Sequence, residues 1–285
     1  MYFHIIHKQR LGNNLANAAV AACCISIAVI SIPAAEPAPA LQTDRQYDTP
    51  RTIITLNSHR GFILQPRKPA ADGSHPWLWY APTFINILPD HSNEWLLSRL
   101  LDKGFAIVGV DVGESYGNPA GRKTFSEFYD YFLKTYHLDP KVSLLPQSRG
   151  GLMLYNWAVE NPEKILCIGA IFPVCDPSSY PGLDKAAPAY HMTREQFAAH
   201  LAEHNPLDRL EPLARAHIPI FHVQGDSDVI VPLEKNSGPL RDRYVALGGR
   251  MDLLIIPGKG HQVDPAFFEC EPLLRFLERG GRPDQ

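Results

Sequence analysis

Ser148 stands where a short apolar strand is expected to give way to a helix. Residues 142–145 read Val-Ser-Leu-Leu between two prolines, which predicts a buried strand too short to be a helix. Two glycines follow within three residues of Ser148, and apolar residues then recur at helical spacing from residue 152 to 158. A strand-to-helix turn this sharp pushes the serine hydroxyl out at the carboxyl edge of a sheet, which is the geometry of a nucleophile elbow.

The elbow pattern around this serine is incomplete. Its common form is G-x-S-x-G, whereas residues 146–150 read Pro-Gln-Ser-Arg-Gly, with proline in place of the first glycine. A serine at the start of a helix is also typical of a simple N-cap. Partner groups elsewhere in the chain have to distinguish the two interpretations.

Two further segments carry the groups that a serine nucleophile needs. Residues 224–232 read Gln-Gly-Asp-Ser-Asp-Val-Ile-Val-Pro, and residues 257–261 read Pro-Gly-Lys-Gly-His; each follows an apolar run. A serine hydroxyl becomes a good nucleophile when a neutral imidazole takes its proton and a buried carboxylate holds that imidazole in the right tautomer. Most of the 12 histidines must be surface residues, but His261 follows a strand and is the expected base.

Alternating strands and helices are expected to bring these segments together. The predicted strands cover residues 51–56, 61–65, 76–80, 105–110, 142–145, 165–172, 218–223 and 251–256. The predicted helices cover residues 93–103, a segment with Phe125, Phe128, Tyr129 and Phe132, the segment after the elbow, and residues 193–204, 240–247 and 265–279. An antiparallel start followed by this alternation specifies an α/β fold with a mostly parallel central sheet and helices on both faces.

We expect a single domain from residue 41 to 285. Its one irregular part, residues 173–215, is Pro-rich and contains the predicted helix 193–204, so we place a small lid insertion at about 176–210. This lid lacks the long apolar helices expected over a lipid-binding tunnel, which argues against a lipase.

Over residues 50–280 the chain resembles the α/β-hydrolase superfamily of serine hydrolases. The G-D-x-D-x-x-V-P form of residues 225–232 is the most specific part of this resemblance. In such hydrolases the aspartate four residues before the V-P proline supplies the acid, which implies Asp228. Asp226 is the competing candidate, and its side chain suits a turn-forming role. The resemblance therefore implies a triad of Ser148, Asp228 and His261.

The same resemblance implies an oxyanion hole of backbone N–H groups. One should come from Arg149, directly after the nucleophile, and the other from the loop after the third strand. That loop reads Tyr-Ala-Pro-Thr-Phe and lacks the His-Gly pair usual in the family. Pro82 has no N–H, so Thr83 is the expected donor, with Ala81 and Phe84 as alternatives.

Polar and aromatic residues near this edge suit a hydroxylated substrate such as a sugar ester. Glu114 and Tyr116 lie in a Gly-rich loop after the strand 105–110, beside the elbow. Tyr80, Tyr116 and Trp79 are candidates to stack on a sugar ring. Trp79 is equally compatible with a place in the core.

Arg149 has two interpretations beyond its backbone N–H. A cation beside the nucleophile is suited to bind a substrate carboxylate. The same side chain is equally suited to a structural pair with Asp111 or Glu114.

The composition excludes other classes of function. The 285 residues are 45% hydrophobic and 20% charged, as in a globular protein with a core, and a net charge of -3 argues against a nucleic-acid partner. No cysteine or histidine spacing resembles a structural zinc site, and triad chemistry requires no metal or organic cofactor. The expected partner is a small-molecule or oligosaccharide ester.

Residues 1–40 have the layout of a secretory signal. Lys8 and Arg10 precede an almost uncharged run from residue 15 to 32, and small residues around Ala38-Pro39-Ala40 offer a cleavage site. The apolar run is also long enough for an uncleaved membrane anchor, and we expect membrane contact only in that case. Either form implies a secreted or periplasmic catalytic part.

Three cysteines remain after the expected cleavage. Cys167, Cys175 and Cys270 cannot all be paired because their number is odd. Buried free thiols are the expectation, and a bridge between Cys167 and Cys175 is the alternative.

These features predict a secreted or periplasmic serine hydrolase that cleaves a carboxylic ester through an acyl-enzyme. The expected substrate is a short acyl ester on a carbohydrate. A peptidase similar to the prolyl oligopeptidase catalytic domain is an alternative, although we expect no room for the gating domain of those enzymes. A non-catalytic binding protein on a hydrolase fold is another, because the elbow is altered and the His-Gly pair is missing.

Overall fold

The computed structural model describes residues 39–283. The predicted secretory signal lies outside the described residues, apart from its last two positions. Within residues 39–283, no helix is long and apolar enough to cross a membrane. In the same range, no group of three or more His, Cys, Asp and Glu side chains is placed to hold a metal ion.

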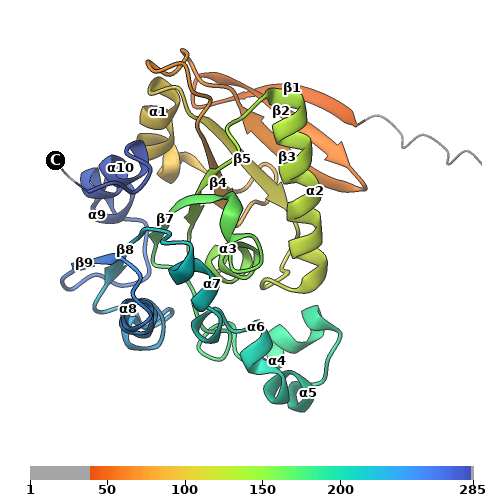
Figure 1. The fold of residues 1–285 in the computed structure, drawn as a ribbon. Coiled ribbons are helices and arrows are strands. Elements are labelled where there is room, and N and C mark those ends of the chain that lie inside the picture. The colour runs from red at the N-terminus through yellow and green to blue at the C-terminus, as the bar shows by residue number, and fades with distance from the viewer. Residues whose placement is uncertain (1–38, 284–285) are drawn as a thin grey trace, which may run out of the picture. The chain divides into compact units, whose positions relative to one another are not determined.

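Across the described residues, nine strands form one sheet in the order β1-β2-β3-β5-β4-β6-β7-β8-β9 (Figure 1). They are β1 (Ala40–Gln46), β2 (Thr49–Leu56), β3 (His59–Leu64), β4 (Trp77–Ala81), β5 (Ala106–Asp111), β6 (Val142–Pro146), β7 (Ile165–Ile171), β8 (Ile220–Gly225) and β9 (Met251–Ile256). The pairs β1–β2, β2–β3 and β3–β5 are antiparallel, and all pairs from β5 to β9 are parallel. The sheet is therefore mostly parallel with an antiparallel start, as predicted.

Helices cover both faces of this sheet (Figure 1). One face packs against α1 (Glu94–Asp102), α9 (Pro265–Phe268) and α10 (Glu271–Glu278). The other face packs against α2 (Pro119–Tyr136), α3 (Gly150–Ala158), α7 (Glu211–Arg215) and α8 (Ser237–Ala246). Two apolar cores result, one on each side of the sheet, which confirms the predicted layering.

Strand β4 lies in the middle of the sheet and is buried on both faces. Trp77 and Trp79 point into the core beneath α2 and α3, while Leu78 and Tyr80 point into the opposite core. All four are at most 1% exposed, as expected for a central strand of a parallel sheet. The Trp79 ring packs 5.2 Å from the Trp157 ring. The structure thus corrects the sugar-stacking interpretation of Trp79 in favour of a core position.

Two predicted helices are each broken in two. The helix expected over 193–204 starts as predicted with a Thr193 capping box but divides at His200 into α5 (Arg194–Ala199) and α6 (Leu201–His204). The closing helix divides at Cys270 into α9 and α10. Pro272 lies in the first turn of α10, where its missing N–H costs nothing, but it could not have continued a helix from α9.

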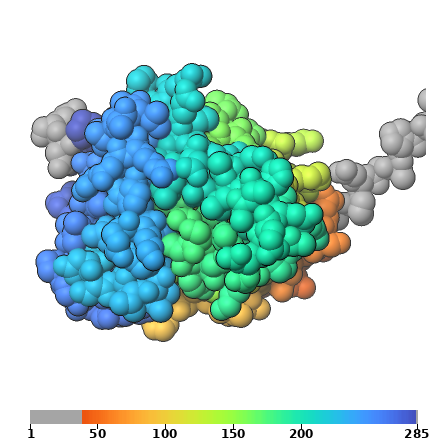
Figure 2. Space-filling view, turned by 90° about the horizontal axis from the view of Figure 1, so that it is seen from below, coloured from red at the N-terminus to blue at the C-terminus, as the bar shows by residue number. Residues whose placement is uncertain are grey.

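The insertion that begins after β7 is a run of short helices, including α4 (Leu183–Ala186), α5, α6 and α7. In Figure 2 the insertion lies beside the segment that contains α8, and Arg243 of α8 donates a hydrogen bond to Asp208. A small apolar cluster of its own, centred on Ala186, Tyr190 and Phe197, holds its first half together.

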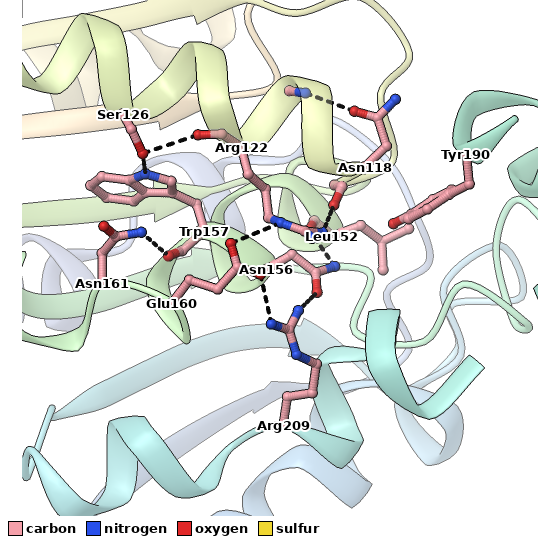
Figure 3. Close-up of polar contacts among 12 residues, drawn as sticks. Asn118, Arg122, Ser126, Leu152, Asn156, Trp157, Glu160, Asn161, Tyr190 and Arg209 are labelled. Atoms are coloured by element: carbon pink, nitrogen blue, oxygen red, sulfur yellow. Dashed lines mark hydrogen bonds and ion pairs between the residues drawn. The ribbon is translucent and has the colours of Figure 1, made fainter. Parts of the chain in front are cut away.

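Polar contacts fasten this insertion to α3 and to the loop after β5 (Figure 3). The Arg209 guanidinium donates to Asn156 Oδ1 at 2.7 Å and to Glu160 Oε1 at 2.8 Å. Arg122 of α2 pairs with the other oxygen of Glu160 at 2.9 Å. The Tyr190 hydroxyl donates to the Tyr116 carbonyl at 2.8 Å. The insertion is therefore attached both to the helix that follows the elbow and to the loop after β5.

The three cysteines of the described residues are free and buried. Cys167 and Cys175 are not bridged, which agrees with the expected free thiols. Burial raises the pKa of the Cys167 thiol to about 12, so this thiol is not a nucleophile at neutral pH.

Candidate active site

Ser148 forms the turn between β6 and α3. Its φ of +50° lies in the left-handed region, a strained backbone conformation for a residue with a side chain. Close approach explains the two glycines that follow. A Cβ on Gly150 would lie 2.0 Å from the Ala81 carbonyl oxygen, and one on Gly151 would lie 2.2 Å from the Val174 carbonyl oxygen. Pro146 in place of the first glycine is accommodated as the last residue of β6, so the elbow forms without it.

The structure brings the three predicted triad residues together. The Ser148 Oγ lies 2.9 Å from His261 Nε2, and His261 Nδ1 lies 2.8 Å from Asp228 Oδ2. The Asp228 carboxylate is buried, and its Oδ1 accepts the N–H groups of Ile230 and Val231 at 2.9 and 2.8 Å. These contacts fix the carboxylate, which in turn orients the imidazole toward the serine.

Asp226 has the turn role that was expected of the competing aspartate. It is exposed, and its Oδ1 accepts the Gly258 N–H at 2.7 Å. This bond joins the turn after β8 to the turn after β9, and therefore helps to place His261 without touching it.

Two backbone N–H groups near the nucleophile have no acceptor. Among residues 39–283, neither the Arg149 N–H nor the Thr83 N–H donates a hydrogen bond. The alternatives are less suited, because the Phe84 N–H donates to Leu88 at 3.2 Å and Ala81 belongs to the sheet. Thr83 is buried, and its hydroxyl donates to the Tyr80 carbonyl at 3.1 Å. Arg149 and Thr83 remain the two candidate oxyanion donors.

A cavity of about 320 Å³ opens beside the serine and the histidine. Its lining is Pro82, Leu88, Gln147, Ser148, Arg149, Phe172, Tyr180, Ile230, His261, Gln262, Val263 and Phe268. The Phe172 ring also packs 4.4 Å from the His261 ring, centroid to centroid. Because much of this lining is apolar, the cavity is suited to a small apolar group attached to the reacting carbonyl.

The side chains predicted to bind substrate make different contacts in the structure. Glu114 pairs with the Arg149 guanidinium at 3.1 Å, and that guanidinium lies 5.1 Å above the Phe84 ring. The Arg149 cation is therefore already partnered, which supports its structural interpretation. Tyr116 is half-buried and packs between the insertion and the apolar cluster at Leu152. Neither Glu114 nor Tyr116 lines the cavity.

Tyr80 does not reach a substrate, which corrects its prediction as a substrate-binding residue. Its side chain is fully buried because β4 is central in the sheet. The Tyr80 hydroxyl donates to Gln147 Oε1 at 3.0 Å, and Asn93 donates to the same oxygen at 2.9 Å. Tyr80 thus acts through Gln147, a cavity residue.

Sequence reasoning missed Gln147, Phe172 and Tyr180 in the cavity lining. Gln147 directly precedes the nucleophile, so its position in the motif could have identified it. Phe172 directly follows β7, so its position at the carboxyl edge of the parallel sheet could also have identified it. Tyr180 comes from the irregular insertion, for which no periodic pattern exists.

Comparisons with family models and with curated proteins give no match, whereas many solved structures match. The chain is similar to a putative dipeptidyl aminopeptidase IV from Bacteroides ovatus, with a TM-score of 0.62 and 16% identity over 85% of this chain and 36% of that one. It is similar to an S-formylglutathione hydrolase from Agrobacterium tumefaciens, with a TM-score of 0.59 and 16% identity over 85% and 96% of the two chains. An acylaminoacyl peptidase from Pyrococcus horikoshii gives a TM-score of 0.63 and 13% identity over 87% and 42%.

These similarities confirm the predicted α/β-hydrolase fold. The chain spans about a third of the dipeptidyl aminopeptidase and nearly all of the S-formylglutathione hydrolase. At such low identity the match concerns the fold, and the function has to be argued from the site.

Proposed function

We propose that this protein is a serine hydrolase that cleaves carboxylic esters through an acyl-enzyme. The observation that carries the proposal is the continuous hydrogen-bonded line from Ser148 through His261 to the buried Asp228. Neither an N-cap serine nor a binding surface requires this arrangement. The strained backbone at Ser148 further supports a nucleophile.

The mechanism follows from these contacts. His261 Nε2 takes the proton of Ser148 as the hydroxyl attacks the ester carbonyl, and Asp228 stabilises the imidazolium. The N–H groups of Arg149 and Thr83 stabilise the oxyanion. His261 then gives the proton to the departing alcohol, and the same residues activate water to release the acid.

The cavity favours a short or medium acyl group, because about 320 Å³ of mostly apolar space lies beside the nucleophile. An acylated sugar is the narrower proposal for the alcohol part. The polar loop after β5 supports it, although Glu114 and Tyr116 of that loop lie outside the cavity lining, and the burial of Trp79 and Tyr80 removes the stacking surface expected from the sequence.

Hydrolysis of p-nitrophenyl esters of increasing acyl length tests this proposal. We expect kcat/KM to be highest for short chains and to fall once the chain exceeds the cavity. Acetylated mono- and oligosaccharides, followed by released acetate, test the sugar. The Ser148→Ala variant should be folded and inactive on every ester; equal hydrolysis by parent and variant would contradict the mechanism.

A peptidase is the second candidate, favoured by the peptidases among the similar structures. The same triad would cleave an amide if the cavity received an amino-acid side chain. Aminoacyl and prolyl p-nitroanilides distinguish the two candidates. Hydrolysis of these amides at rates near those of the esters would favour the peptidase.

We also propose that the protein is exported, on the basis of the signal layout of residues 1–40. Expression of the full chain in a bacterial host, followed by intact mass of the recovered protein, tests this. A periplasmic product that begins between residues 35 and 41 is expected. A membrane-bound product of full mass would support the uncleaved anchor instead.

A further inference from the structure

A chain of buried hydrogen bonds runs from the triad carboxylate into the core. Gln224 Nε2 donates to Asp228 Oδ2 at 3.2 Å, and Ser237 Oγ donates to Gln224 Oε1 at 3.0 Å. The Ser237 hydroxyl lies 2.9 Å from His222 Nδ1, and His222 Nε2 lies 2.6 Å from the Tyr155 hydroxyl. Gln224, Ser237, His222 and Tyr155 are all completely buried.

The catalytic end fixes the orientation of the Gln224 amide. Its Nε2 lies 3.1 Å from the Val231 carbonyl oxygen as well as 3.2 Å from the Asp228 carboxylate. Both partners can only accept hydrogen bonds, so the NH₂ group must face them and the amide oxygen must face Ser237. A flipped amide would set oxygen against oxygen twice. The Ser237 hydroxyl must therefore donate its single proton to the amide oxygen of Gln224.

The donor and the acceptor of each remaining hydrogen bond in this buried series can then be assigned. Because the Ser237 proton is used, its oxygen accepts the Nδ1–H of His222. Burial lowers the pKa of His222 to about 3, so the imidazole is neutral and its Nε2 carries no proton. The Tyr155 hydroxyl then donates to that Nε2. Every bond points the same way, from the core toward Asp228.

We propose that Gln224, held in place by the chain Ser237–His222–Tyr155, is a positioning residue for the Asp228 carboxylate. This inference rests on the proposed function. Asp228 Oδ2 accepts from Gln224 and from His261, while Oδ1 accepts two backbone N–H groups. With donors on both oxygens, the carboxylate cannot rotate away from the imidazole.

The chain also joins the nucleophile to the acid through the core. Tyr155 belongs to α3, which begins two residues after Ser148, whereas His222 and Gln224 belong to β8 and Ser237 begins α8. The network therefore links the helix that follows Ser148 to the strand and the turn that carry Gln224 and Asp228. Partial loss of such a network leaves buried groups unpaired, which makes its effect larger than that of one exposed bond.

The Ser237→Ala variant tests this role with the smallest change in volume. It removes the donor to Gln224, and we expect kcat on a p-nitrophenyl ester to fall ~10-fold with KM nearly unchanged, the cost of one misplaced bond to a charged group. Labelling by a fluorophosphonate should slow to the same extent. Gln224→Met, which removes the amide, should lose at least as much. Ser237→Thr keeps the hydroxyl and should restore most of the rate.

Ser143→Ala is the matched control. Ser143 is a completely buried serine of β6, two strands away from β8, and its hydroxyl accepts a hydrogen bond from the Cys167 thiol, outside the Tyr155–His222–Ser237–Gln224 chain. We expect its kcat to equal that of the parent. Because both variants lose one buried hydroxyl, a general loss of stability would affect Ser143→Ala and Ser237→Ala alike.

A spectroscopic readout separates positioning from stability. The proton on His261 Nδ1 should give a far-downfield ¹H resonance that His261→Ala lacks. We expect this resonance to shift in Ser237→Ala and to stay in place in Ser143→Ala. Tyr155→Phe keeps the ring in the core and removes the first donor, and it should produce a smaller shift in the same direction; it also serves if Ser237→Ala does not fold.

Two failures can be told apart. If the parent is labelled and active but Ser237→Ala and Gln224→Met match it in kcat, labelling rate and resonance, the positioning role is wrong and the hydrolase stands. If folded parent protein is neither labelled nor active, the proposed function is wrong and the positioning role is wrong with it.

Discussion

The two aspartates of the turn after β8 differ in what their carboxylates contact. Asp228 is buried and contacts His261, two backbone N–H groups and Gln224. Asp226 is exposed and accepts the Gly258 N–H. Two residues of the same type, two positions apart, thus differ in burial and in hydrogen-bond partners, and we assign them separate roles on that basis.

Substitution of each aspartate by asparagine tests this division. Asp228→Asn should lower kcat by about 10⁴-fold, because an amide in place of the carboxylate no longer stabilises the imidazolium or selects its tautomer. Asp226→Asn keeps an oxygen that can accept the Gly258 N–H, so its kcat should stay within a few-fold of the parent. Steady-state kinetics on one p-nitrophenyl ester decide the matter. Equal losses in the two variants would contradict the assignment of the acid.

His222 connects the polar chain to the pH dependence of stability. Burial lowers its pKa from 6.5 to about 3. Between pH 6.5 and about 3, His222 is therefore protonated in the unfolded chain but neutral in the folded protein. The contribution of His222 to the free energy of unfolding is therefore fully present above pH 6.5, and it is lost progressively as the pH falls from 6.5 toward 3.

The His222→Gln variant should show a weaker acid dependence than the parent. Between pH 6 and 4, the slope of its unfolding free energy against pH should be smaller by one proton, about 1.4 kcal/mol per pH unit. Urea unfolding at several pH values measures both slopes. Parallel curves for parent and variant would show that His222 does not remain neutral in the folded protein.

Among individual residues, those that directly follow a predicted strand could be placed from the sequence. Ser148 and His261 each follow one, and the acid turn resembles a known motif, so their convergence could be predicted. Tyr80 could not be placed correctly, because its strand turned out to be the central one and is buried on both faces. Gln224 was visible beside the acid, but its role depends on Ser237 and Tyr155, which lie on other elements.

The elbow is an element held in place by close backbone contacts. The start of α3 is wedged between the end of β4 and the segment after β7, at Gly150 and Gly151. Any side chain at these positions would push α3 away from the sheet and displace the nucleophile.

Gly150→Ala should therefore destabilise the fold more than a substitution that causes backbone strain without a steric clash. Its Cβ would lie 2.0 Å from the Ala81 carbonyl oxygen, and we expect loss of several kcal/mol of stability, or of folding, together with loss of fluorophosphonate labelling. Gly73→Ala is the control: Gly73 has a φ of +76° but no atom near its Cβ, so it should cost only about 1–2 kcal/mol of backbone strain. Thermal unfolding measures both, and a mild Gly150→Ala would refute the wedge.

The attachment of the insertion gives a second prediction at the scale of elements. Arg209→Ala removes the donors to Asn156 and Glu160 (Figure 3). Because Asn156 is completely buried, its amide oxygen is left unpaired, and we expect about 2 kcal/mol of destabilisation. Limited proteolysis should then cut within residues 176–210 before the rest of the domain.

Arg215→Ala is the matched control for that experiment. Arg215 lies in the same segment and pairs with Glu211, but its side chain is 78% exposed. An exposed pair of this kind contributes little, so the loss should stay within about 0.5 kcal/mol. Equal proteolysis of Arg209→Ala and Arg215→Ala would show that the buried contacts do not anchor the insertion.

Elements with a strong period were predictable and those without one were not. The strand hairpin, the parallel strands and the helices α1, α2 and α3 follow apolar patterns that read correctly. β1 is an edge strand whose residues are almost all exposed, so its sequence has no apolar alternation and it was not among the predicted strands. The insertion divides into short helices because its few apolar residues form a small core of their own.

For the whole molecule, the sheet explains why a site could be predicted without a close relative. A parallel sheet places the ends of β6, β8 and β9 at one edge, whatever the surface residues are. A putative dipeptidyl aminopeptidase, an acylaminoacyl peptidase and an S-formylglutathione hydrolase have similar folds, so the fold alone does not determine which bond is cleaved.

Whether Ser148 is an activated nucleophile is the question on which this account depends. Intact mass of the parent and of Ser148→Ala after incubation with a fluorophosphonate answers it most directly. We predict a single adduct on the parent and none on the variant, with the adduct also lost in His261→Ala. Folded parent protein that gains no adduct would contradict the account, and binding assays with sugars would then replace enzymology.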